Sequence, residues 1–88
     1  YLMLALGIDE EKTALGLNIF PNPARNEINV LFEDKSQAEK LLLFDMTGRI
    51  VETTLNTNRL NVQQLPSGTY LLKVFIKGNA INHRVVIQ

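Results

Sequence analysis

The chain has 88 residues, of which 45% are hydrophobic, and nine basic residues balance nine acidic ones. This length suits one domain with a modest core, because folding at this size buries only about 60–65% of the unfolded surface. The zero net charge excludes a strong overall attraction to nucleic acid or to an anionic membrane. The absence of cysteine excludes disulfides, thiolate metal sites and a cysteine nucleophile.

The charges are distributed unevenly along the chain. Residues 1–52 carry nine acids and five bases, a net charge of −4, whereas residues 53–88 carry four bases and no acid, a net charge of +4. A folded sheet interleaves the two halves, so we expect a surface of mixed charge.

The first residues resemble connecting chain. YLMLALG, residues 1–7, is too short to span a bilayer and lacks the basic flank of a signal peptide. Because the chain begins with tyrosine, we interpret residues 1–6 as a remnant strand of a preceding domain. GIDEEKTALG, residues 7–16, is interpreted as a linker in which Asp9 could cap a short helical turn. The prediction is therefore linker and remnant over residues 1–16 and one domain over residues 17–88.

From residue 17 onward, short apolar runs are separated by turn residues at intervals of about 8 to 12 residues, a pattern typical of sandwiches and barrels. Alternation places Ile28, Val30 and Phe32 on one face of a strand, and the stretch from Tyr70 to Ile76 alternates in the same way. SQAEKLLLF has some helical propensity, but the turns on both sides favour a strand. The predicted fold is all-β, a sandwich with strands at residues 17–20, 27–33, 39–45, 49–55, 60–62, 69–76 and 80–88.

Two stretches near the centre of the chain carry more detail. EKLLLFD, residues 39–45, is a nearly continuous apolar run, which is typical of a strand covered on both faces. DMTG, residues 45–48, has the layout of a type I turn. Asp45 can bond its own backbone there, and Gly48 supplies the left-handed residue that closes a bulged hairpin.

FPNP, residues 20–23, places two prolines immediately before the clearest strand. Pro21 and Pro23 have no amide proton and push the preceding residues into extended conformations. We interpret this stretch as a stiff hinge that ends the first strand, blunts a sheet edge and lets the chain cross to the other sheet. No chemistry is required of Asn22.

Residues that could carry out catalysis or bind a cofactor are scarce. His83 is the only histidine, so a surface or structural role is expected for it. Asp9, Glu10 and Glu11 follow one another and do not converge as the ligands of a calcium loop do. The glycines never form a phosphate-binding GxGxxG. We expect no cofactor, no metal and no enzymatic activity.

The aromatic residues do not form an obvious binding platform. Phe32, Phe44 and Tyr70 fall on apolar strand faces and are predicted to lie in the core. Phe75, between Lys73 and Lys77 on its own face, is the aromatic residue expected to make a surface contact.

The order of these motifs resembles a known family. An aromatic residue before PNP, an alternating strand, LLLFDMTGRIV, LPSGTYLLKV and the ending NHRVVIQ together resemble the C-terminal sorting domain, type A, of the type IX (Por) secretion system of Bacteroidota. The resemblance covers residues 17–88, and GIDE, residues 7–10, looks like the linker that often precedes such domains. Neither PNP nor G-x-Y is specific alone, but their order and spacing are.

The resemblance implies an immunoglobulin-like β-sandwich of about seven strands. It also implies a set of recognition and folding positions, namely Pro21, Asn22 and Pro23; Asp45, Gly48 and Val51; Gly68 and Tyr70; and Arg84, Val85, Val86 and Ile87. Gly68 and Tyr70 also fit a turn glycine and a core tyrosine whose hydroxyl bonds a loop, as in a tyrosine corner. Family members often end in a basic residue, whereas this chain ends in Gln88.

The implied function is export of a larger, covalently attached cargo. The cargo would reach the periplasm, cross the outer membrane with the type IX machinery, and end at the cell surface or in the medium after a surface signal peptidase cleaves within residues 7–16. Lys73, Lys77 and Arg84 are expected to form the face that docks on the machinery. No nucleic acid and no membrane insertion are expected, and an open sheet edge would allow a dimer.

Two other functions fit the sequence less well. A fibronectin-like or immunoglobulin-like accessory module of a secreted enzyme would share the fold, and an exposed row of aromatic side chains would favour it. It would not explain the order of the motifs. An enzyme fragment is disfavoured by the single histidine and the absence of cysteine.

Overall fold

The computed structural model describes residues 16–88. These residues form seven strands and no helix, and therefore no helix that could cross a membrane. The strands are β1 (Leu17–Phe20), β2 (Glu27–Phe32), β3 (Lys40–Phe44), β4 (Ile50–Leu55), β5 (Arg59–Asn61), β6 (Gly68–Ile76) and β7 (Asn79–Ile87). All seven predicted strands are confirmed, with ends that differ by one residue or less. The remnant strand, the turn at Asp9 and nearly all of the linker lie outside the described residues.

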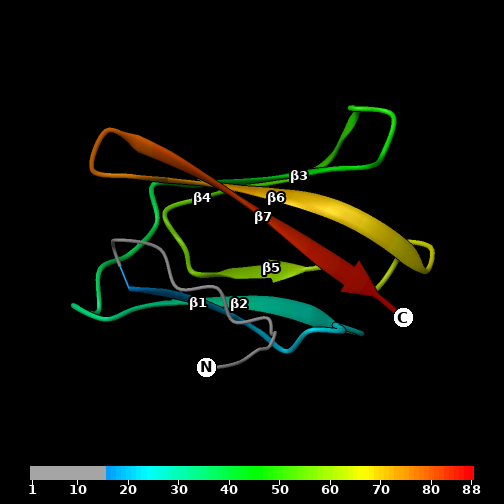
Figure 1. The fold of residues 1–88 in the computed structure, drawn as a ribbon, viewed down its shortest axis with the longest axis horizontal. Coiled ribbons are helices and arrows are strands. Elements are labelled where there is room, and N and C mark those ends of the chain that lie inside the picture. Colours follow the sequence, from blue (N-terminus) through cyan, green and yellow to red (C-terminus); the bar gives the residue numbers. More distant parts are fainter. Residues whose placement is uncertain (1–15) are drawn as a thin grey trace, which may run out of the picture.

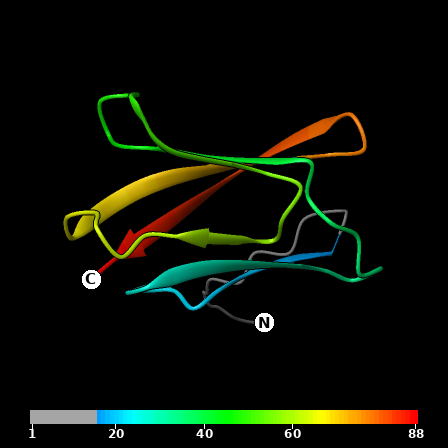
Figure 2. The same cartoon turned by 180° about the vertical axis from the view of Figure 1, so that it is seen from behind.

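The strands form two antiparallel sheets that pack face to face (Figures 1 and 2). One sheet has the order β1-β2-β5 and the other the order β4-β3-β6-β7. In the letters used for immunoglobulin domains, A-B-E faces C′-C-F-G. The predicted all-β sandwich of seven strands is confirmed.

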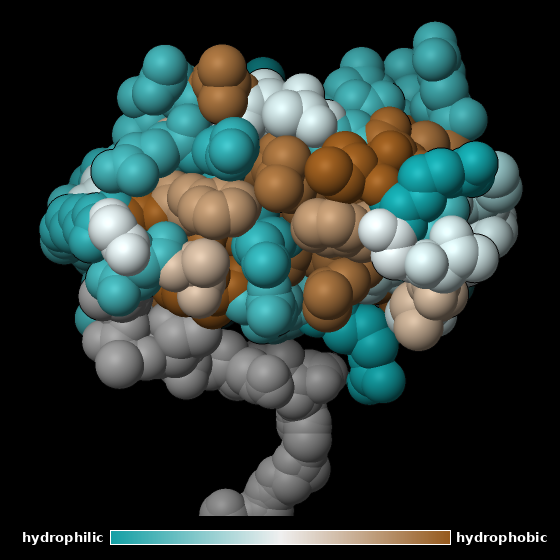
Figure 3. Space-filling model, turned by 90° about the horizontal axis from the view of Figure 1, so that it is seen from above, coloured by the Kyte–Doolittle hydropathy of each residue, from teal (hydrophilic) through white to brown (hydrophobic). Residues whose placement is uncertain are grey.

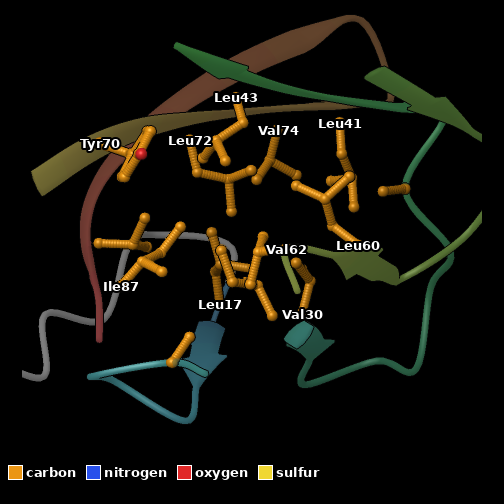
Figure 4. Packing of buried hydrophobic residues seen from close by; sticks show 14 of the residues in the cluster. Leu17, Val30, Leu41, Leu43, Leu60, Val62, Tyr70, Leu72, Val74 and Ile87 are labelled. Atoms are coloured by element: carbon orange, nitrogen blue, oxygen red, sulfur yellow. The ribbon is translucent and has the colours of Figure 1, made fainter. Parts of the chain in front are cut away.

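The core lies between the sheets (Figure 4). The predicted alternation is confirmed, since Ile28, Val30 and Phe32 of β2 point inward, as do alternate residues of β6 from Tyr70 to Ile76. Val85 and Ile87 of β7 complete this cluster. Among the described residues no polar or charged side chain is buried, so burial of apolar surface is the main stabilising term.

The turn after β3 forms as predicted. The Asp45 carboxylate accepts hydrogen bonds from the N–H (2.9 Å) and the hydroxyl (2.6 Å) of Thr47 and from the N–H of Arg49 (3.1 Å). The Gly48 N–H donates to the Asp45 carbonyl at 3.0 Å, and the φ of Gly48 is +92°, which favours glycine. The pairing of β3 with β4 shifts between Leu43 and Phe44, which is the predicted bulge.

The interpretation of β3 as a strand covered on both faces is wrong for the described residues. Leu41 and Leu43 are fully buried, but Leu42 and Phe44 point away from the core, where no other described strand covers them. Phe44 is therefore not a core residue, although Phe32 and Tyr70 are. The periodicity of an apolar run cannot tell which of its two faces meets the second sheet.

The expected crossing at FPNP is also wrong. β1 and β2 are neighbours in one sheet, and Phe20 pairs with Asn29 across them. The chain therefore turns back into the same sheet after the prolines, whose preceding peptide bonds are both cis.

Candidate functional site

The loop that contains the PNP motif lies against the C-terminal strand. The Asn22 side-chain oxygen accepts a hydrogen bond from the Val86 N–H (3.1 Å), and the Ala24 N–H donates to the Val86 carbonyl (2.8 Å). The Gln88 N–H donates to the Ala24 carbonyl at 2.8 Å, and Ala24 and Ile87 form a parallel bridge. We call this set of contacts the β7 clamp. It covers the outer edge of the last part of β7 and joins the two sheets.

Asn22 has a structural role in the clamp, as a hydrogen-bond acceptor for β7, which the sequence analysis did not predict. β7 is the end strand of its sheet and runs diagonally from the four-stranded sheet toward the three-stranded one (Figure 1, red). Its outward N–H groups need acceptors from elsewhere in the chain, and Asn22 supplies one across 64 positions. The sequence did offer one indication of this role. Two prolines have no N–H to donate, and the asparagine between them is the side chain of this motif that can make hydrogen bonds in their place.

The G-x-Y motif lies beside the clamp. Gly68 pairs with Ile87 and Tyr70 pairs with Val85 across β6 and β7. The Tyr70 ring is buried at 5% exposure, and its hydroxyl donates to the Pro66 carbonyl at 2.7 Å. This is the expected tyrosine corner. Gly68 has a φ of +155°, a conformation that residues with side chains rarely adopt.

The D-x-x-G turn is at the same end of the sandwich, because Phe44, the residue before Asp45, pairs with Leu71 near the start of β6. Val51, the last position of this motif, is half-buried and packs against the core. The PNP loop, the D-x-x-G turn, the G-x-Y stretch and the end of β7 therefore gather at one end of the molecule, on the right in Figure 1. We call this the motif end.

The three basic residues expected to form one docking face are not together. Lys73 and Arg84 lie on the outer face of the four-stranded sheet, on neighbouring strands, and both line one hollow. Lys77 is in the β6–β7 turn, at the other end of β6, where its ammonium group forms a 2.7 Å ion pair with Asp34. Period-two alternation would place residues 73 and 77 on the same face of one strand. It does not show that β6 ends at Ile76, before Lys77.

Two carboxyl groups have shifted acidity because of local hydrogen bonds. Bonds from the Thr47 hydroxyl and the Arg49 N–H lower the pKa of Asp45 to about 2. A bond from the Lys77 ammonium, assisted by Ser36, holds the pKa of Asp34 well below its usual range. Both carboxylates accept hydrogen bonds within turns and pair with a basic side chain, Asp45 with Arg49 and Asp34 with Lys77, so their role is to stabilise the fold.

Asn58 was not identified from the sequence. Its side chain accepts a hydrogen bond from the Ala38 N–H (2.6 Å) and donates one to the Ser36 carbonyl (2.9 Å). Its own carbonyl accepts from the Val30 N–H at 2.8 Å. Asn58 thus joins the β2–β3 loop to the segment before β5. Its partners lie 20 and 22 positions away, so local turn chemistry could not indicate them.

His83 is half-buried on β7, and its Nδ1 lies 3.0 Å from the Arg84 carbonyl. Within residues 16–88 no three histidine, cysteine or acidic residues gather where they could hold a metal ion.

These features define a class of protein: a small immunoglobulin-like sandwich whose sequence motifs assemble one end of the fold. The family described as the secretion system C-terminal sorting domain matches residues 18–88, and the chain belongs to this family. It is a C-terminal sorting signal of the type IX secretion system, as the motifs had indicated. The family is not catalytic, and its members belong to secreted or cell-surface cargo.

A solved structure has a similar fold. It is that of PorZ, described as an essential bacterial surface component of the type IX secretion system of Porphyromonas gingivalis. The TM-score is 0.62 and the sequence identity 20%, over 83% of this chain and 11% of the PorZ chain. The likeness concerns the fold alone. A comparison with curated proteins gave no match.

Proposed function

We propose that the type IX machinery recognises this domain in its folded form, at the motif end and on the adjoining outer face of the four-stranded sheet. The observation that carries the proposal is that four motifs, separated in the sequence, meet at one end, where the β7 clamp fastens the PNP loop to the final strand. A signal read as an unfolded peptide would not need the Asn22 bond to Val86 or the Tyr70 bond to Pro66.

The route of the cargo is part of this proposal. The covalently attached upstream cargo enters the periplasm, the folded domain directs it through the outer membrane, and the surface signal peptidase cleaves within residues 7–16. The domain itself has no hydrolytic activity, binds no nucleic acid and does not insert into the membrane.

The accessory-module function is not favoured. Phe44 and Phe75 both lie on the outer face of the four-stranded sheet, but they occupy opposite ends of the stretch of β3 that pairs with β6. The ammonium group of Lys73 lies 6.0 Å from the centre of each ring. A sugar platform would need neighbouring exposed rings, which this arrangement does not provide.

The expected dimer stays a prediction. β4 and β7 are the end strands of the four-stranded sheet, and β7 is covered by the clamp only near its end. Sedimentation of the 88-residue chain over a range of concentrations measures whether copies pair through these edges.

An export assay tests the proposal. Residues 8–88 are placed behind a fluorescent cargo with a periplasmic signal peptide, in a bacterium with an active type IX system. We expect cargo at the surface or in the medium, with a new terminus inside residues 7–16 by mass spectrometry, and periplasmic retention without the domain. Retention of cargo that carries a folded domain would refute the proposal and support an accessory module.

A further inference from the structure

The outer face of the four-stranded sheet carries more apolar surface than a water-facing sheet needs. Strand residues that point outward alternate with the buried ones, and Figure 3 shows apolar side chains gathered in the middle of this face. Its larger apolar residues include Leu42, Phe44, Ile50, Leu55, Leu71 and Phe75. Ile50 and Leu55 are 51% and 61% exposed. We call this surface the outer patch.

We propose that the outer patch binds a segment of a partner protein in which carboxylates stand between apolar side chains. This inference rests on the proposed function, because it names the chemistry of what recognises the domain. The first argument is the sequence of β3. A run such as KLLLF is typical of a strand covered on both faces, yet no described element covers its outer side. A bound partner segment would cover this outer face of β3.

The charges of the outer patch give the second argument. Lys40, Lys73 and Arg84 lie on it, and none of the outward-facing residues of the four strands is acidic. None of the three forms an ion pair among the described residues, where the pairs are Asp45–Arg49, Glu27–Arg59 and Asp34–Lys77. Carboxylates from a partner would complement these cations.

The position of the lysines indicates where the carboxylates would lie. The Lys40 ammonium group is 4.9 Å from the centre of the Phe75 ring, and that of Lys73 is 6.0 Å from the rings of both phenylalanines. Lys73 therefore lies among the apolar side chains, and Lys40 stands between Leu55 and Phe75 in the same row of the sheet. A complementary segment therefore has acidic and apolar side chains interspersed.

A hollow near the motif end provides a place for one anchoring side chain. It has a volume of about 430 Å³, and Phe44, Met46, Leu71, Lys73 and Arg84 contribute to its lining. Asp45 also borders it, but the Asp45 carboxylate is already bound by Thr47 and Arg49 within its own turn. The walls suit a large apolar side chain with a carboxylate beside it, held by Lys73 and Arg84.

Two other occupants fit less well. A second copy placed face to face by a two-fold axis would bring these cations against the same cations. A lipid surface would need a cluster of protruding apolar side chains, whereas the rings of Phe44 and Phe75 are half-buried, and the two most exposed residues of the patch, Ile50 and Leu55, lie at opposite ends of the edge strand β4. An acidic, apolar protein segment satisfies both the charge and the shape.

The test combines export with site-specific crosslinking in the exporting bacterium. The variant Lys73→Glu with Arg84→Glu should reduce export by about tenfold or more, because it places carboxylates against carboxylates. The control Lys35→Glu with Arg59→Glu changes the same charge at exposed positions in the β2–β3 loop and on β5, away from both the outer patch and the motif end, and should export normally. The charge-retaining pair Lys73→Arg with Arg84→Lys should also export, and each purified chain is checked for folding by its thermal unfolding curve.

Crosslinking identifies the occupant. A photoreactive amino acid at position 71, on the outer patch, is compared with one at Leu31, which is exposed on the other sheet. We expect position 71, and not 31, to crosslink to a protein segment that contains both acidic and apolar residues. Crosslinks to lipid only, to a second copy of this chain, or to a basic segment would overturn the inference, as would normal export of the Lys73 and Arg84 reversal. Failure of the unmodified domain to export would instead refute the proposed function.

Discussion

At the scale of single residues, Asn22 shows how a motif position can act through the fold. Its side chain accepts the Val86 N–H, a group on the outer edge of β7 that would otherwise lack a partner in the described chain. Pro21 and Pro23 on either side cannot donate hydrogen bonds. The motif therefore holds the end of β7, the strand that carries the final motif.

We expect Asn22→Ala to weaken this attachment. Loss of one hydrogen bond of this kind costs about 0.5–1.5 kcal/mol of unfolding free energy. The amide of Val86 should exchange with solvent faster, while amides in the centre of β3 change only with global stability. Asn26→Ala is the matched control, since Asn26 bonds Val62 through its backbone carbonyl. Equal effects of the two variants on Val86 would contradict the clamp.

A second residue-scale prediction concerns Tyr70. Tyr70→Phe keeps the buried ring but removes the bond to the Pro66 carbonyl. Stability should fall by about 0.5–1.5 kcal/mol, measured by urea unfolding, without a change in the slope of the transition. Tyr70→Ala should cost about 3–5 kcal/mol, because it also leaves a cavity in the core. If Tyr70→Phe were as damaging as Tyr70→Ala, the hydroxyl and not the ring would carry the stability.

At the scale of elements, β7 is both the last sorting motif and part of the core. Ile87 is 2% exposed, whereas its neighbour Val86 points outward. Deleting residues 82–88 would therefore remove Val85 and Ile87 from the core together with any recognition surface. Loss of export after such a deletion would not separate failed folding from failed recognition.

Single substitutions in β7 separate these effects. Ile87→Ala should lower the free energy of unfolding by about 2–5 kcal/mol, since it empties a buried position. Val86→Ala, one position away on the outer side, should change it by about 0.5–1 kcal/mol. Thermal unfolding of the purified chain compares them. Similar losses for both would show that β7 is not anchored in the core through alternate residues.

The strands themselves were more predictable from the sequence than the strands that become their neighbours. The seven strands, the inward face from Tyr70 to Ile76 and the turn at Asp45 follow from period-two patterns and local turn chemistry. The outward face of Phe44, the return of the chain into the same sheet after Pro23, and the ion pair that draws Lys77 away from Lys73 depend on which strands become neighbours. Single-sequence patterns carry no such information, because a strand has two faces and two edges.

At the scale of the whole molecule, the fold mixes the charges of the two halves of the chain, as expected. The acidic first half supplies Asp34 and Glu27, which pair with Lys77 and Arg59 of the basic second half. These ion pairs are exposed and contribute little to stability individually. Three of the described cations outside these pairs, Lys40, Lys73 and Arg84, lie on the outer patch, so the charge balance of the whole chain conceals one locally basic, apolar surface.

The same carboxylates determine how the sandwich responds to acid. Hydrogen bonds depress the folded-state pKa of Asp45 to about 2, below the value of about 3.9 expected in an unfolded chain. The unfolded state therefore binds the proton more readily, and the contribution of Asp45 to stability is fully present above about pH 4–5 and is lost as the pH falls toward 2. The Lys77 bond to Asp34 acts in the same direction. Acid should thus destabilise the domain most steeply below pH 4.

Unfolding curves measured between pH 7 and pH 2 check this. Asp45→Asn should be less stable than the unmodified chain at pH 7, and the gap should close toward pH 2, where the protonated carboxyl group also lacks a charge. Glu52→Gln, which removes a charge of the same sign outside this turn, is the control. A gap for Asp45→Asn that stays constant across the whole range would mean that the turn does not depend on the carboxylate charge, and that its amide replacement fails for steric reasons.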